Sequence, residues 1–73
     1  FLLEIGPPRE FVGRRIRDLD IRNRHQVEVV MIKRALPGQD ARLTTPSANT
    51  VLRESDTMLI LGDRHHVEAF SRL

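Results

Sequence analysis

The run Val27–Arg34 constrains the fold more than any other part of the chain. It is β-branched and apolar for most of its length, and the turn-rich segment Pro37–Asp40 follows it. Branched side chains pack well on a pleated surface, so the run predicts a strand. Simple alternation would place apolar side chains on both faces: Val27, Val29 and Met31 on one, Val30 and Ile32 on the other. We therefore expect a central strand that is covered on both sides.

The other segments supply elements to surround this strand. We expect short strands at Phe1–Ile5 and Ala41–Thr44, a strong strand at Thr57–Leu61, and helices at Glu10–Leu19 and after the capping residue Asp63. The spacing predicts two apolar helix faces: Val12, Ile16 and Leu19 in the first helix, and Val67, Phe70 and Leu73 in the second. Residues 20–26 would be a linker. The β-α-β-β-β-α order predicts a small α+β domain with its helices on a mixed or antiparallel sheet.

The length of 73 residues allows one domain with a modest core, to which a second subunit or a parent protein would add stability. Two short helices would cover one face of the central strand and leave its other apolar face bare, so we expect a homodimer. The chain has no cysteine and no apolar run of the roughly 20 residues that span a bilayer. It opens on Phe1 and closes inside an expected helix, so residues 1–73 are interpreted as a single domain of a longer protein.

The charge pattern is consistent with two surfaces. Twelve basic and ten acidic residues give a formal net charge of +2, and the two signs are interleaved along the chain. This favours a solvated surface of mixed charge. The alternative is a basic patch that binds nucleic acid, but the only aromatic residues are three phenylalanines, which is few for a base-stacking platform.

The sequence gives little indication of an enzyme or of a metal site. His65 and His66 are adjacent, so on a helix they would point about 100° apart, and His25 lies in the expected linker. The serines stand in no nucleophile motif, and the glycines form no phosphate loop. We expect no catalysis and no bound metal.

Arg22 is the candidate for an anion contact. It stands just before the central strand, and a guanidinium fork suits phosphate oxygens. The alternative is an ion pair with Asp18 or Asp20, which spacing alone favours.

Four stretches, in this order, resemble the C-terminal subdomain of the RCK (regulator of potassium conductance) family, also called the TrkA-C domain. They are Phe11–Leu19, Val27–Arg34, Pro46 and Leu52–Gly62. The family has a Val-Gly helix start, a valine-rich strand that ends in a basic residue, a proline that opens a loop, and a Gly-Asp turn before the last strand. Gln26 and Ser55 stand where the family usually has glycine.

The resemblance implies a cytoplasmic regulatory module of a potassium or other cation channel, uptake system or antiporter. Such a module dimerises and couples binding of a small ligand to transport. In one branch the ligand is cyclic di-adenosine monophosphate, held in the dimer groove, and the matching positions are Ile16, Asp20, Ile21, Arg22, Asn23, Val29 and Pro46. Glu28 stands where that branch often has a neutral polar residue, and its carboxylate would repel a phosphodiester.

Overall fold

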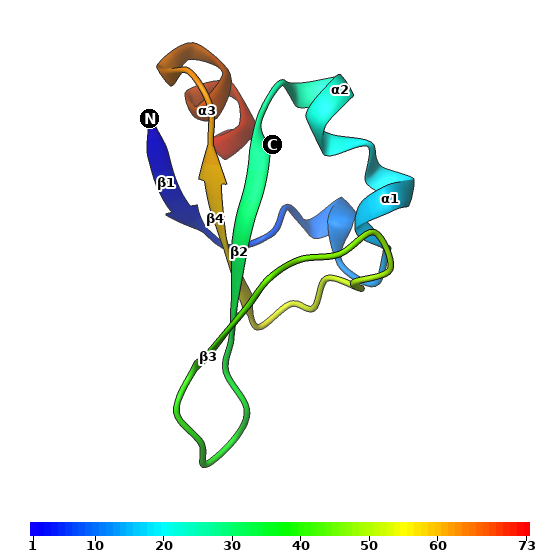
Figure 1. Cartoon of the computed structure of the whole chain (residues 1–73), viewed down its shortest axis with the longest axis vertical. Coiled ribbons are helices and arrows are strands. Elements are labelled where there is room, and N and C mark those ends of the chain that lie inside the picture. The colour runs from blue at the N-terminus through cyan, green and yellow to red at the C-terminus, as the bar shows by residue number, and fades with distance from the viewer.

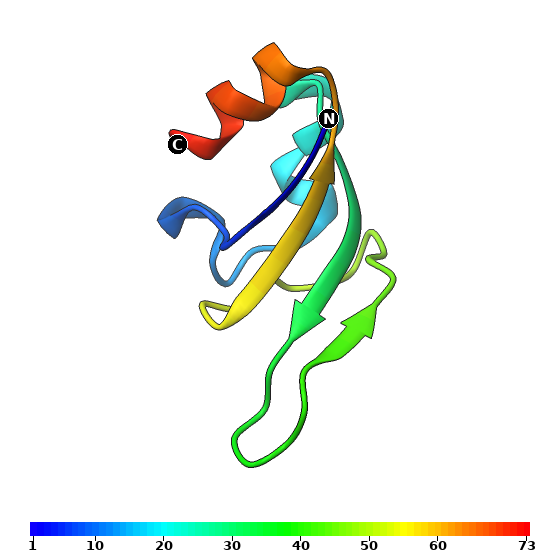
Figure 2. The same ribbon diagram turned by 90° about the vertical axis from the view of Figure 1, so that its left-hand side faces the viewer.

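The computed structural model describes all 73 residues as a four-stranded antiparallel sheet with helices on one of its faces (Figures 1 and 2). The strands, in the order β1-β4-β2-β3 across the sheet, are β1 (Leu2–Ile5), β4 (Asp56–Leu61), β2 (Glu28–Arg34) and β3 (Arg42–Thr44). The helical segments are η1 (Arg9–Phe11), α1 (Ile16–Leu19), α2 (Ile21–His25) and α3 (Arg64–Ser71). The α+β prediction is confirmed, and the sheet is antiparallel throughout. None of these helices is long and apolar enough to cross a membrane.

Strand β2 lies inside the sheet, as predicted, but its side chains do not alternate simply. Val29 pairs with Ile60 of β4, whereas Met31 pairs with Leu59, so Val30 is an extra residue that forms a bulge. Beyond the bulge, Ile32 turns to the same face as Val29 and is fully buried. The predicted division of the strand into two faces was therefore wrong after Val29, because period-two counting does not anticipate a bulge.

The single helix predicted over Glu10–Leu19 is also wrong. The chain makes the single turn η1, breaks at Gly13, and begins α1 at Ile16. Gly13 has φ of +85°, in the left-handed region that a helix interior excludes, and its N–H donates to the carbonyl oxygen of Leu52. As a result Val12 is exposed, and Phe11 is buried in the core in place of Val12, which we had predicted there.

The predicted linker over residues 20–26 contains a helix, α2. Asp20, with φ of 47°, separates α1 from α2, and Gln26, with φ of 54°, ends α2. Gln26 occupies the left-handed conformation that favours glycine, the residue that the family resemblance implies at this position.

The hairpin between β2 and β3 projects away from the helices (Figure 2). Gly38 has φ of +73° and the N–H of Gln39 donates to the carbonyl oxygen of Leu36, as in a type II turn. Strand β3 lies at the edge of the sheet, and all three of its residues are exposed.

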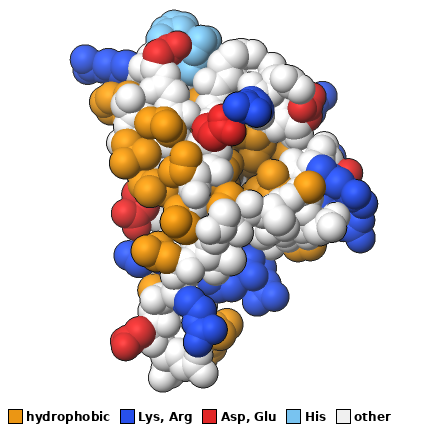
Figure 3. All heavy atoms as spheres, viewed as in Figure 1, with side chains coloured by type: hydrophobic (Ala, Val, Ile, Leu, Met, Phe, Trp, Pro, Cys, Tyr) orange, Lys and Arg blue, Asp and Glu red, His pale blue; other side chains and the backbone are white.

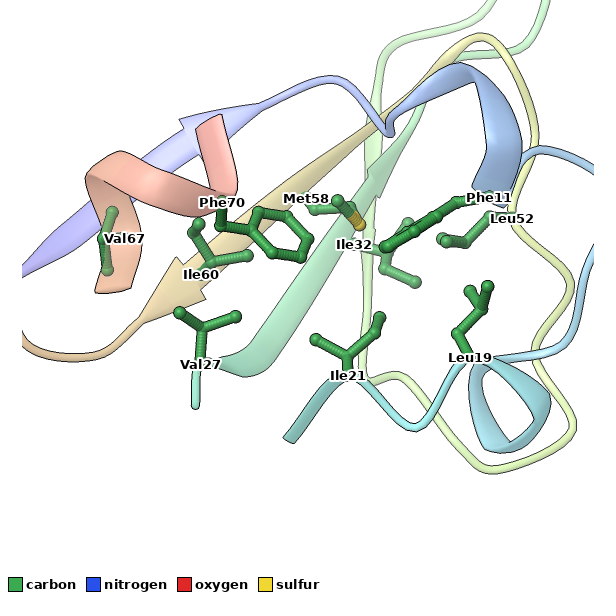
Figure 4. Packing of buried hydrophobic residues seen from close by; sticks show 10 residues of the cluster. All are labelled: Phe11, Leu19, Ile21, Val27, Ile32, Leu52, Met58, Ile60, Val67 and Phe70. Carbon is green, nitrogen blue, oxygen red and sulfur yellow. The ribbon is translucent and has the colours of Figure 1, made fainter. Parts of the chain in front are cut away.

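The core lies between the sheet and the helices (Figure 4). It is formed by ten buried side chains: Phe11, Leu19, Ile21, Val27, Ile32, Leu52, Met58, Ile60, Val67 and Phe70. Val67 and Phe70 join it as predicted, but Leu73 is exposed because α3 ends at Ser71. The carboxylate of Asp63 accepts from the N–H of His66 at 3.0 Å, which confirms the predicted cap.

The opposite face of the sheet has no helix over it. Residues that are paired on neighbouring strands point to the same face of the sheet. By this register, the apolar residues of the opposite face are Leu2, Met31, Leu43, Leu59 and Leu61. Figure 3 shows hydrophobic side chains gathered over the strands on the side toward the viewer. We call these five residues the open sheet face. On the same side of the sheet, Lys33 Nζ lies 3.6 Å from Glu4 Oε1 and forms an ion pair with it.

Candidate functional site

A groove of about 480 Å³ runs between β2, the α1–α2 segment and the loop after β3. Its lining residues are Ile16, Arg17, Asp20, Ile21, Arg22, Val27, Glu28, Val29, Pro46, Ser47 and Ala48. We call it the α1–α2 groove. It combines an apolar surface with two arginines and two carboxylates, a composition suited to a ligand with both apolar and charged parts.

The structure brings six of the seven predicted site residues together in this groove: Ile16, Asp20, Ile21, Arg22, Val29 and Pro46. They come from segments far apart in the sequence. The seventh, Asn23, does not line the groove; its Nδ2 donates to Asp20 Oδ1 at 2.8 Å. The other five lining residues were not predicted as site residues: Arg17, Val27, Glu28, Ser47 and Ala48. Only their nearness in the chain to predicted site residues could have indicated them.

The wall formed by residues 46–48 is positioned by backbone hydrogen bonds to the start of α1. The N–H of Ile16 donates to the carbonyl oxygen of Thr50 at 2.9 Å, and that of Arg17 donates to Ala48 at 3.0 Å. Ser47 and Thr50 close the loop on itself, because the Ser47 N–H donates to Thr50 Oγ1 at 2.9 Å. The loop and the start of α1 therefore form one irregular ribbon along the groove.

Arg22 pairs with Glu28 and not with Asp18 or Asp20, the partners we considered from spacing. Its Nε lies 3.2 Å from Glu28 Oε2, and the two side chains are 77% and 45% exposed. The turn at Gln26 reverses the chain and places the start of β2 beside α2, which brings Glu28 to Arg22. The groove's best candidate for phosphate binding is therefore already paired with a carboxylate.

A second charged pair lies at the other end of β2. Arg34 Nε donates to Asp56 Oδ1 at 2.9 Å, and Arg34 Nη2 donates to Asp56 Oδ2 at 2.8 Å. This two-pronged hydrogen bond, helped by the N–H of Arg53, holds the pKa of the Asp56 carboxyl below its usual range despite burial, and it raises the pKa of Arg34. No local pattern in the sequence indicates this pair.

The histidines are dispersed. His66 Nδ1 lies 2.7 Å from Asp63 Oδ2, and the pKa of Asp63 is lowered chiefly by its hydrogen bond from the His66 backbone. His25 ends α2 and packs its ring against Phe11 and Phe70, with ring centroids 5.8 and 5.3 Å apart. No group of three or more His, Asp and Glu side chains is arranged to hold a metal ion.

Comparison with known proteins agrees with the sequence resemblance. The model of the TrkA-C domain matches residues 1–73. The chain belongs to the TrkA-C domain family. This domain is 30% identical over 57 residues to the K(+)/H(+) antiporter subunit KhtT of Bacillus subtilis (strain 168). The match covers 78% of the chain and 33% of KhtT, so the domain spans about a third of that relative.

Solved structures match the fold of this TrkA-C domain. The RCK C domain of the potassium transport protein KtrA, solved in complex with cyclic di-adenosine monophosphate, has a TM-score of 0.78 and 25% identity, covering 97% of this chain and 79% of that chain. The GsuK RCK domain also has a TM-score of 0.78, at 20% identity over 97% of this chain and 15% of that chain. The predicted family and fold are confirmed, and the nucleic-acid-binding alternative receives no support.

Proposed function

We propose that this TrkA-C domain is the regulatory module of a longer potassium or other cation transport protein, on its cytoplasmic side, and that it binds cyclic di-adenosine monophosphate in the α1–α2 groove. The observation that carries the proposal is the convergence of six residues, chosen from sequence, in one groove. The KtrA relative, whose RCK C domain was solved with this nucleotide, supports the choice of ligand. The role is regulatory, with no bond made or broken in the ligand.

The chemistry of the groove fits a cyclic dinucleotide. Ile21 and Pro46 offer apolar contact to a base, and Asn23, which lies outside the groove, donates to the Asp20 carboxylate that lines it. Arg22 and Arg17 supply guanidinium groups to the phosphates. Binding at Arg22 requires this side chain to leave Glu28, which is feasible because the pair is largely exposed.

The direct test is calorimetry with cyclic di-adenosine monophosphate on the wild-type chain and on Arg22→Ala. Charge-assisted hydrogen bonds contribute roughly 1.5–3 kcal/mol, so the variant should bind about ten- to a hundredfold more weakly. Arg64→Ala is the matched control, since Arg64 is also an exposed arginine paired with a glutamate, but it lies on α3. Adenosine mono- and dinucleotides serve as comparison ligands. Equal affinity of wild type and Arg22→Ala would refute the assigned role.

We also propose a homodimer that covers the open sheet face. Leu2, Leu43 and Leu61 on this face are 54%, 66% and 44% exposed, an unusual cost for a small domain in water. Glu28 pairs across the sheet with Leu61 and also lines the groove, so the groove borders this face and would lie near the subunit boundary.

Sedimentation equilibrium at micromolar concentration should give twice the monomer mass. Leu59→Glu, at the centre of the open sheet face, should give the monomer, whereas Leu73→Glu, an exposed leucine beyond α3, should not. A wild-type chain that remains monomeric at high concentration would remove the dimer and leave the groove to be tested on single subunits.

A further inference from the structure

Asp56 is the one buried charged residue of this chain, with 2% of its surface exposed. A buried carboxylate is costly unless it is fully paired, and here it is: it accepts two hydrogen bonds from Arg34 and one from the N–H of Arg53, at 2.9 Å. Arg34 Nη2 also donates to the carbonyl oxygen of Val51 at 3.1 Å. The pair therefore joins three pieces of chain: the end of β2, the start of β4, and residues 51–53 between β3 and β4.

Residues 51–53 continue directly into the groove wall. The N–H of Leu52 donates to the carbonyl oxygen of Arg14 at 3.0 Å, and Val51 forms an isolated bridge with Arg15. Next along the same ribbon are the bonds from Ile16 to Thr50 and from Arg17 to Ala48, which end in the groove. One end of this ribbon is thus fixed to the sheet by the Arg34–Asp56 pair, and its other end forms the wall that contains Pro46.

Building on the proposed function, we propose that Arg34 and Asp56 are positioning residues of the α1–α2 groove: their ion pair sets the place of the 46–53 loop, and with it the wall that a ligand contacts. Neither residue lines the groove. An apolar pair of similar size often stabilises a fold as well as a buried ion pair does. What the apolar pair would not supply is the set of directed hydrogen bonds from the Arg34 guanidinium, which orient the loop. Arg34 reaches both Asp56 and Val51, and this double contact needs the planar guanidinium.

The test uses Arg34→Lys, which keeps the charge and loses the fork, and the double variant Arg34→Met with Asp56→Leu, which keeps a filled, apolar site. The matched control is Arg64→Lys, because Arg64 donates to Glu68 at 2.9 Å on α3, away from the groove. If the lysine variant does not fold, the double variant carries the test.

Amide hydrogen exchange is the main readout, since it reports the ribbon and the sheet separately. We expect the amides of Ile16 and Arg17 to exchange about tenfold faster or more in either variant, relative to amides of the β1–β4 ladder. Arg64→Lys should leave that ratio unchanged. Ribbon and ladder amides that speed up by the same factor would overturn the proposal, because the pair would then contribute only to global stability.

Ligand affinity is the second readout. The dissociation constant for cyclic di-adenosine monophosphate should rise about tenfold in the double variant while the ladder stays protected, a change that a purely structural role would not produce. Unchanged affinity would contradict the proposal. The exchange measurement needs no ligand, so a wild-type chain that binds no cyclic di-adenosine monophosphate would refute the proposed ligand and leave the exchange result to decide the role of the pair.

Discussion

Replacing Glu28 with glutamine should make the α1–α2 groove bind an anionic nucleotide more tightly. The Glu28 carboxylate lies 3.2 Å from Arg22 Nε, and with the side chains 77% and 45% exposed such a pair contributes about 0.5–1 kcal/mol. A phosphate bound at Arg22 would lie about 6 Å from that carboxylate, where repulsion in water is about 0.7 kcal/mol. Removing the charge therefore favours binding by about 1–2 kcal/mol, or roughly five- to thirtyfold.

Calorimetry of Glu28→Gln against wild type, with cyclic di-adenosine monophosphate at low and at physiological salt, measures this gain. The gain should shrink as salt rises, because both charges are exposed to solvent. Glu68→Gln is the control, since it makes the same charge change in an arginine-paired glutamate on α3. If Glu28→Gln binds no better than wild type, Glu28 does not compete for Arg22. Weaker binding would mean that it holds Arg22 in the binding orientation, and the reasoning above would be refuted.

Three further predictions concern stability. Gln26→Gly should raise the free energy of unfolding, measured in urea, by up to about 1 kcal/mol, because φ of 54° strains glutamine. A lower free energy of unfolding would show that the 2.6 Å hydrogen bond from Gln26 Nε2 to the Asn23 carbonyl outweighs the strain. Because the folded-state pKa of Asp56 is lowered, the stability that its carboxylate contributes is fully present above the unfolded pKa of about 3.9 and is lost as pH falls through the folded value. At acidic pH, the urea midpoint of wild type should therefore decrease with falling pH more steeply than that of Asp56→Asn. Ile60→Ala, fully buried at the centre of the core, should cost about 2–5 kcal/mol by the same urea assay, and a smaller cost would indicate local collapse around the site.

Much of the sheet could be predicted from sequence, and much of the helical layer could not. Strands β2 and β4 follow from branched, apolar runs, which have few other solutions in a chain of this size. The prediction of a single helix over Glu10–Leu19 was wrong because the apolar spacing continues through Gly13. The positive φ of Gly13 depends on a long-range hydrogen bond to Leu52. Helix α2 was missed because its polar surface and short length resemble a linker.

The functional site, too, could be predicted from the sequence only in part. Its members were predicted through the family resemblance, and the fold then placed six of them together. The partner of Arg22 was missed because Glu28 reaches it only through the left-handed turn at Gln26, which no local rule for glutamine predicts. The pairing of Arg34 with Asp56 depends on the register of β2 with β4, which puts these two residues directly opposite each other.

The position of β4 in the sheet also determines when the domain can fold. Both of its edges are occupied, by β1 from the start of the chain and by β2 from the middle. During synthesis, β1 therefore has no strand to pair with until residues 56–61 have left the ribosome, and closing that long loop is a slow, non-local step. Until then the valine-rich β2 stands with one long edge unprotected, so the interval before β4 arrives is the period in which the nascent chain is most prone to aggregate.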